Sequence, residues 1–109
     1  MISDDDIEAA LDFLRDNAER AGKAIADAEL VREYRKVKKA ELMGLCNEGS
    51  AVAQERFAYA HPDYAAHLEV MRTAITRAET ARFLMKEKDA RIDAWRTQQS
   101  NQRSMGKIV

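Results

Sequence analysis

The amino-acid sequence predicts an all-α fold: an antiparallel hairpin of two long, coiled-coil-like helices with a short helix at the turn. The first observation is the shortage of helix breakers, because the 109 residues include one proline and four glycines. The second is composition: charged residues make up 34% and hydrophobic residues 46%, but aromatic residues only 6%, which is typical of long helices. The third is the recurrence of apolar residues at spacings of four and three. The length indicates a single domain, residues 1–109.

We expect the first helix to run from residue 4 to residue 46. Ser3 is a suitable N-cap, and the aspartates at positions 4–6 place carboxylates at the positive end of the helix dipole. The expected apolar seam begins at spacings of four and three with Ile7, Leu11, Leu14, Ala18, Ala21, Ile25 and Ala28. It then slips, without ending the helix, to Val31, Tyr34, Val37, Leu42 and Leu45.

The segment from Asn47 to Ser50 interrupts the helical pattern, because Gly49 suits a helix end and Ser50 can cap the next helix. We expect a short helix over residues 51–60. Since Pro62 suits a first helical turn, the last helix is expected over residues 62–103, followed by a frayed tail at 104–109. The expected seam of the last helix is Tyr64, Leu68, Met71, Ile75, Ala78, Met85, Ile92 and Gln99.

Charge is distributed in blocks, although the net charge is only −1. Residues 1–30 contain nine acidic and three basic residues, whereas residues 82–109 contain seven basic and three acidic residues. An antiparallel hairpin that turns near residues 48–61 lays these blocks side by side. The midpoint of that turn predicts that Asp12 lies level with Arg96, and Asp27 with Arg82.

Several large side chains exceed what one two-helix seam can cover, and we interpret them as an oligomer or partner interface. These residues are Phe13, Leu30, Phe57, Tyr59, Phe83 and Trp95. The interpretation that we favour is a homodimer or homotetramer in which hairpins form a four-helix assembly. In the alternative, the 51–60 helix folds over one end of a monomer and buries several of them.

The sequence offers little from which to build a catalytic or metal site. His61 and His67 are six positions apart, whereas histidine ligands on one helix usually sit four apart, and Cys46 completes no ligand set with them. There is no glycine-rich phosphate loop and no nucleophile elbow. We therefore expect no catalytic residue, no metal and no cofactor, and a protein that is not an enzyme.

The expected location is the cytoplasm, which is the host cytoplasm if a phage encodes the chain. A single cysteine allows no internal disulfide, and the first residues do not resemble a secretory leader. No apolar stretch approaches the roughly 20 residues that a bilayer-spanning helix needs, so we expect no membrane partner.

Nucleic-acid binding is an alternative, because basic residues cluster on two helix faces. The candidate residues are Arg32, Arg35, Lys36, Lys39, Arg96 and Arg103, and Trp95 offers an indole for base stacking. In the interpretation that we favour, Trp95 belongs to the core and the C-terminal arginines pair with the acidic N-terminal half. Exposed ion pairs of this kind contribute about 0–1 kcal/mol each, so they indicate direction more than stability.

Two segments resemble a family of small helical-hairpin proteins of tailed phages and prophages, whose function is uncharacterised. They are the turn Gly49-Ser50-Ala51-Val52-Ala53-Gln54-Glu55-Arg56-Phe57-Ala58-Tyr59-Ala60 and the later Trp95-Arg96-Thr97-Gln98-Gln99. The turn has one residue more before Glu55-Arg56 than the family pattern. The resemblance covers nearly the whole chain and implies a phage gene often found near replication and recombination genes, but it carries over no catalytic residue.

These observations predict a non-enzymatic phage protein that acts through protein–protein contacts, as an accessory to phage DNA recombination or replication. The first alternative is a direct DNA-binding protein that uses its basic helix faces. The second is an inhibitor of a host defence protein, in which the acidic residues 4–16 mimic nucleic acid.

Overall fold

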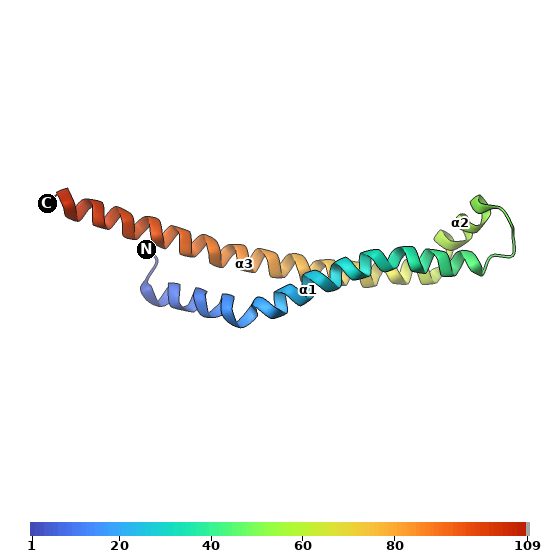
Figure 1. The fold of residues 1–109 in the computed structure, drawn as a ribbon, viewed down its shortest axis with the longest axis horizontal. Coiled ribbons are helices and arrows are strands. Elements are labelled where there is room, and N and C mark those ends of the chain that lie inside the picture. The colour runs from blue at the N-terminus through green and yellow to red at the C-terminus, as the bar shows by residue number, and fades with distance from the viewer. Residues whose placement is uncertain (109) are drawn as a thin grey trace. The chain divides into compact units, whose positions relative to one another are not determined.

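The computed structural model describes the backbone of residues 1–108 and the side chains of residues 1–106. Three helices follow one another along the chain: α1 (Asp4–Gly44), α2 (Ala51–Ala60) and α3 (Pro62–Ile108) (Figure 1). No strand occurs in this part of the chain, so the all-α prediction is confirmed. The chain divides into a unit of Met1–Gly22 with Thr80–Val109, here the terminal unit, and a unit of Lys23–Glu79, here the turn unit.

The helices begin where side chains satisfy their first backbone N–H groups. At the start of α1, the amide of Asp6 donates to Ser3 Oγ at 3.1 Å, and the amide of Ser3 donates to Asp6 Oδ2 at 2.9 Å. This reciprocal pair is a capping box with aspartate in the place of glutamate. Ser50 Oγ accepts from the amide of Ala53 at 3.2 Å to cap α2, and His61 Nδ1 accepts from the amide of Asp63 at 3.0 Å before α3.

The helix ends differ from the expected ones. The last turn of α1 tightens, because the amides of Leu45 and Cys46 bond the carbonyls three residues back, so the α-helix ends at Gly44 rather than at 46. α3 continues to Ile108, past the expected end at 103 and through most of the expected frayed tail. No proline interrupts this stretch, and Gly106 costs a helix only about 1 kcal/mol. Val109 lies outside the described residues.

The buried seam of α1 differs from the predicted one at Leu11 and Ala18, which are exposed, whereas Ile25 is half-buried beside Ala24. Ile7, Leu14, Ala21 and Ala28 lie on the seam as predicted. The seam residue that follows each of the first three lies three positions later in the chain, whereas the prediction placed it four positions later. The seam comprises Ile7, Ala10, Leu14, Asn17, Ala21, Ala24, Ala28, Val31, Lys38 and Leu42. Ala10 is 2% exposed and Leu11 52% exposed. Of the five residues predicted beyond the slip, Val31 and Leu42 lie on the seam, whereas Tyr34, Val37 and Leu45 are exposed.

The seam of α3 needs a smaller correction, because Leu68 is the only one of its predicted residues that is exposed. It comprises Tyr64, His67, Met71, Ala74, Ala78, Ala81, Met85, Lys88, Ile92, Trp95 and Gln99. His67 is 8% exposed, whereas the predicted Leu68 is 43% exposed. Two helices cover only one narrow stripe of each other, and small side chains let their backbones approach closely. The contact is therefore centred largely on alanines, and Leu11, Leu30 and Leu68 remain exposed beside it.

In the terminal unit, the first part of α1 packs antiparallel to the last part of α3. The side-chain amide of Gln98 bonds the backbone of Ile2 twice, at 3.0 and 3.3 Å. The indole N–H of Trp95 donates to Asp4 Oδ1 at 3.3 Å, and Lys88 Nζ lies 5.1 Å from the centre of the Phe13 ring. These pairs have position numbers that add up to between 99 and 101.

The predicted register, with position numbers that add up to about 109, is therefore wrong. Asp12 pairs with Arg15 at 3.2 Å, and Arg96 pairs with Asp93 at 3.6 Å, so the predicted level pair of Asp12 and Arg96 is not formed. The prediction assumed that the connection between the long helices is symmetric about its midpoint. In the turn unit it is not, because α2 lies against the last turns of α1, where Lys39 pairs with Glu55 at 3.1 Å.

Candidate interaction surface

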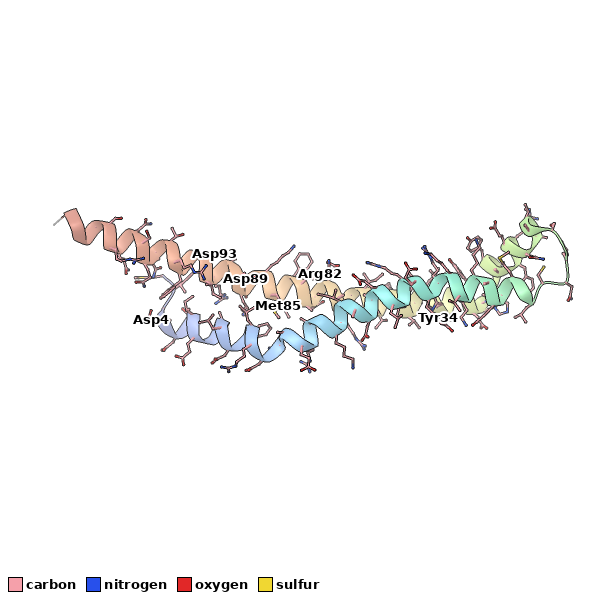
Figure 2. The ribbon with its side chains drawn as sticks, in the orientation of Figure 1. Asp4, Tyr34, Arg82, Met85, Asp89 and Asp93 are labelled. Atoms are coloured by element: carbon pink, nitrogen blue, oxygen red, sulfur yellow. The ribbon has the colours of Figure 1, made fainter. Side chains whose placement is uncertain are left out.

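The six residues predicted to form an interface differ in how much surface they expose. Leu30 is 70% exposed and Phe83 66% exposed, and Phe57 and Tyr59 are also exposed. Phe13 and Trp95 are half-buried. The side chain of Phe13 faces the ammonium of Lys88, and the indole of Trp95 is bonded to Asp4, whose position at the start of α1 is labelled in Figure 2. Phe13 and Trp95 therefore contribute to packing within the terminal unit.

Phe57 and Tyr59 belong to an aromatic cluster that attaches α2 to the rest of the turn unit. The ring of Tyr59 meets that of Tyr64 edge to face, with 5.2 Å between centroids and 79° between planes. The ring of Phe57 lies 5.8 Å from that of His61. Edge-to-face pairs of this kind contribute about 0.5–1.5 kcal/mol beyond their buried area. The exposure of Phe57 and Tyr59 is therefore only partial, and much of each ring packs within the chain.

Lys39 connects this cluster to α1. Its Nζ lies 3.1 Å from Glu55 Oε1 and 5.0 Å from the centre of the Tyr59 ring. Hydrogen bonds to Tyr59 and then to Glu55 raise the pKa of Lys39 above its usual value. These contacts hold the ammonium of Lys39 against α2. Lys39 is therefore not free to bind phosphate as part of the basic face that the sequence predicted.

Several exposed apolar side chains of the turn unit lie on one side of α1 and α3. Leu30, Tyr34 and Val37 succeed one another at spacings of four and three, so they share one face of α1. The Tyr34 ring, labelled in Figure 2, lies 5.6 Å from that of His67 on α3. Val70 lies one turn beyond His67 and is 56% exposed.

Because the helices run antiparallel there, Val70 comes level with Leu30, one turn before Tyr34. We call Leu30, Tyr34, Val37 and Val70 the turn-unit apolar face. The sequence prediction included Leu30 only, since it assigned Tyr34 and Val37 to the seam and did not single out Val70. The seven-residue step from Leu30 to Val37 could have shown that both residues lie on one face of the first helix, since residues seven apart share a helix face.

The predicted nucleic-acid residues fall into separate places. Arg32, Arg35, Lys36 and Lys39 belong to the turn unit, and Arg96 and Arg103 to the terminal unit. Lys36 pairs with Glu33 at 3.0 Å, and Lys39 with Glu55. Arg32 and Arg35 are exposed, and neither has an ion pair within the described residues. Within the turn unit, they are the two of these basic residues left accessible to a phosphate backbone.

The predicted absence of a metal site rested on His61, His67 and Cys46, and each of these has a partner in the fold. His61 Nδ1 caps α3, and the Nε2–H of His67 donates to the carbonyl oxygen of Val31 at 3.2 Å. Cys46 Sγ lies 4.0 Å from the carbonyl oxygen of Ala53. Within residues 1–106, no three His, Cys, Asp or Glu side chains are grouped as a metal site requires.

Comparison with family models, curated proteins and solved structures finds no match. None of the helices described is long and apolar enough to cross a bilayer. The surface that the helices present is therefore the guide to function.

Proposed function

We propose that this chain is a non-enzymatic helical interaction protein that acts through protein–protein contacts. The observation that carries the proposal is the turn-unit apolar face, on which four aliphatic or aromatic side chains stand exposed on adjacent helices. Contiguous exposed apolar side chains with charged neighbours are typical of protein interfaces. Side chains at helical spacing on a rigid pair of helices also suit the recognition of another helix.

The first partners to test come from the sequence resemblance. It suggests an accessory role in phage DNA recombination or replication, so purified phage recombination and replication proteins are the panel we would use. Binding to the immobilised chain is expected to be lost in a Leu30→Asp/Val70→Asp variant, because buried carboxylates without partners oppose docking. Val52→Asp is the matched control, since Val52 is exposed in the same unit but lies on α2. Equal binding by the wild type and the double variant would refute the role of this face.

A second candidate function is direct DNA binding, supported by the exposure of Arg32 and Arg35 on α1. A mobility-shift assay at low salt is the test, because phosphate contacts weaken as salt rises. Arg32→Ala/Arg35→Ala is expected to weaken binding, whereas Lys36→Ala, whose ammonium is paired with Glu33, is expected to weaken it less. Absence of any shift at low salt would remove this candidate.

A further inference from the structure

Charged residues lie at seven-residue spacings before and after the apolar residues of the turn-unit apolar face. On α1, Tyr34 is preceded seven residues earlier by Asp27 and followed seven residues later by Glu41. Leu30 and Val37 continue a second row that begins at Lys23. On α3, the same seven-residue step runs from Asp63 through Val70 to Arg77. Seven residues are close to two helical turns, so each row stays on one side of its helix.

The two ends of the face carry opposite charge. The end away from the turn contains Lys23, Arg77 and Asp27, with a net charge of +1. The end near the turn contains Glu41 and Asp63, with a net charge of −2, which Lys38 partly offsets because its Nζ lies 3.5 Å from Glu41. The apolar residues lie between these ends.

A hollow on α3 borders the positive end of the face. It is lined by Arg72, Thr73, Thr76 and Arg77. Thr73 and Arg77 lie three and seven residues after Val70, on the same side of α3. Arg72 is held by Glu69 at 3.0 Å, whereas Arg77 has no ion pair within the described residues. A guanidinium beside threonine hydroxyls is suited to a carboxylate, since arginine binds carboxylates through paired, charge-assisted hydrogen bonds.

We propose that the turn-unit apolar face binds a second copy of this chain, with the two turn units antiparallel about a two-fold axis near Leu30 and Val70. In that arrangement, Lys23 and Arg77 of each copy meet Glu41 and Asp63 of the other. A two-fold interface uses the same surface on both copies, so a surface that carries opposite charges at its two ends satisfies it without any further partner. A parallel arrangement would instead place like charges together, which opposes it.

This inference rests on the proposed function, because it names the protein that the interaction surface binds. Four apolar side chains with their charged neighbours form a smaller interface than the roughly 20 residues per partner of a standard one. We therefore expect a dimer that dissociates on dilution. The charged ends specify direction and partner more than they add affinity.

The test is a charge exchange followed by light scattering of the full chain at a series of concentrations. Variant one is Lys23→Glu, and variant two is Glu41→Arg. Each alone is expected to weaken dimerisation by about tenfold or more, because like charges then face each other at both ends. An equimolar mixture is expected to recover dimers, since every contact between the two variants again joins opposite charges.

Recovery in the mixture separates the proposed contact from simple misfolding, which mixing does not repair. Circular dichroism of each variant confirms that the helices are retained. Arg56→Glu is the control, because Arg56 is an exposed cation of the same unit that lies on α2. A wild type that is monomeric at every concentration, or a mixture no more dimeric than its parts, would overturn the inference. Loss of binding to a heterologous protein in Leu30→Asp/Val70→Asp would still support the proposed function in either case.

Discussion

His67 on α3 donates its Nε2–H to the main-chain carbonyl of Val31 on α1, at 3.2 Å. A carbonyl oxygen can only accept, so Nε2 of the ring carries a proton. The ring is also in contact with Tyr34, at 5.6 Å between centroids. This hydrogen bond lets a polar side chain occupy a seam position with its donor satisfied. It also aligns the two helices of the turn unit.

The first prediction compares His67 with its neighbour Leu68. We expect His67→Ala to lower the free energy of unfolding by about 1–2 kcal/mol, since it removes a buried side chain and an interhelical hydrogen bond. Leu68→Ala is expected to cost about 0.5 kcal/mol or less, because Leu68 is 43% exposed. Urea unfolding of both variants measures the difference. A larger cost for Leu68→Ala would mean that the seam follows the leucines, as the sequence suggested.

The seam shows how far the sequence could predict this fold. Helix starts were predictable from Ser3, Ser50 and Pro62, because capping and proline chemistry act locally. Heptad positions such as Ile7 and Ala28 were also predictable, since residues seven apart stay on one face. The choice between His67 and Leu68 was not, because hydrophobicity favours leucine whereas close packing of the alanines brings histidine inward.

The register of the long helices and the exposed face could not be predicted, for a related reason. Both depend on where α2 lies, and its position is determined by Lys39, Glu55 and Tyr59, which are brought together by the turn rather than by a local pattern. The sequence did predict Leu30 as a partner residue. It missed Val70, because neither helix alone shows that Val70 comes level with Leu30.

The second prediction concerns the capping box at the start of α1. Ser3→Ala removes the acceptor for the Asp6 amide, and we expect a loss of about 1 kcal/mol at pH 7 in chemical unfolding. Ser100→Ala is the control, since Ser100 is exposed within α3 and alanine is a better helix former. A larger loss for Ser100→Ala than for Ser3→Ala would contradict the assignment of the cap.

The third prediction is the pH dependence of the same cap. Hydrogen bonds from the backbone and then the side chain of Ser3 lower the pKa of Asp6 from its usual 3.8. The folded state therefore favours the carboxylate, and its contribution to stability is present above the unfolded pKa and is lost as pH falls below it. We expect the stability difference between wild type and Asp6→Asn to shrink between pH 7 and pH 3. A difference that grows on acidification would show that the carboxylate has no such role.

The fourth prediction uses Trp95, the single tryptophan of the chain, as a reporter of the N-terminal segment. Its indole bonds Asp4, and Gln98 one turn later bonds the backbone of Ile2. Asp4→Ala and Gln98→Ala are each expected to shift the tryptophan emission to longer wavelength and increase quenching by acrylamide, because the indole becomes more hydrated. Asp5→Ala, which removes an exposed neighbouring carboxylate, serves as the control. Equal spectra in all three variants would mean that the N-terminal segment does not shield Trp95.

The fifth prediction concerns the attachment of α2 to α1. Lys39→Met removes the ion pair with Glu55 and the ammonium over Tyr59, so we expect faster proteolysis of the connection at residues 45–50 and faster amide exchange in α2. Lys36→Met is the matched control, since Lys36 pairs with Glu33 on the same helix and touches no residue of α2 in the described contacts.

The same contact should depend on pH. Tyr59 and Glu55 raise the pKa of Lys39, so the stability that Lys39 contributes is present below the unfolded pKa and is lost as pH rises through the folded pKa. Wild-type α2 should therefore exchange faster, relative to Lys39→Met, as pH approaches that of lysine deprotonation. If Lys36→Met and Lys39→Met expose the connection equally, general loss of helix charge explains the effect, and Lys39 does not hold α2.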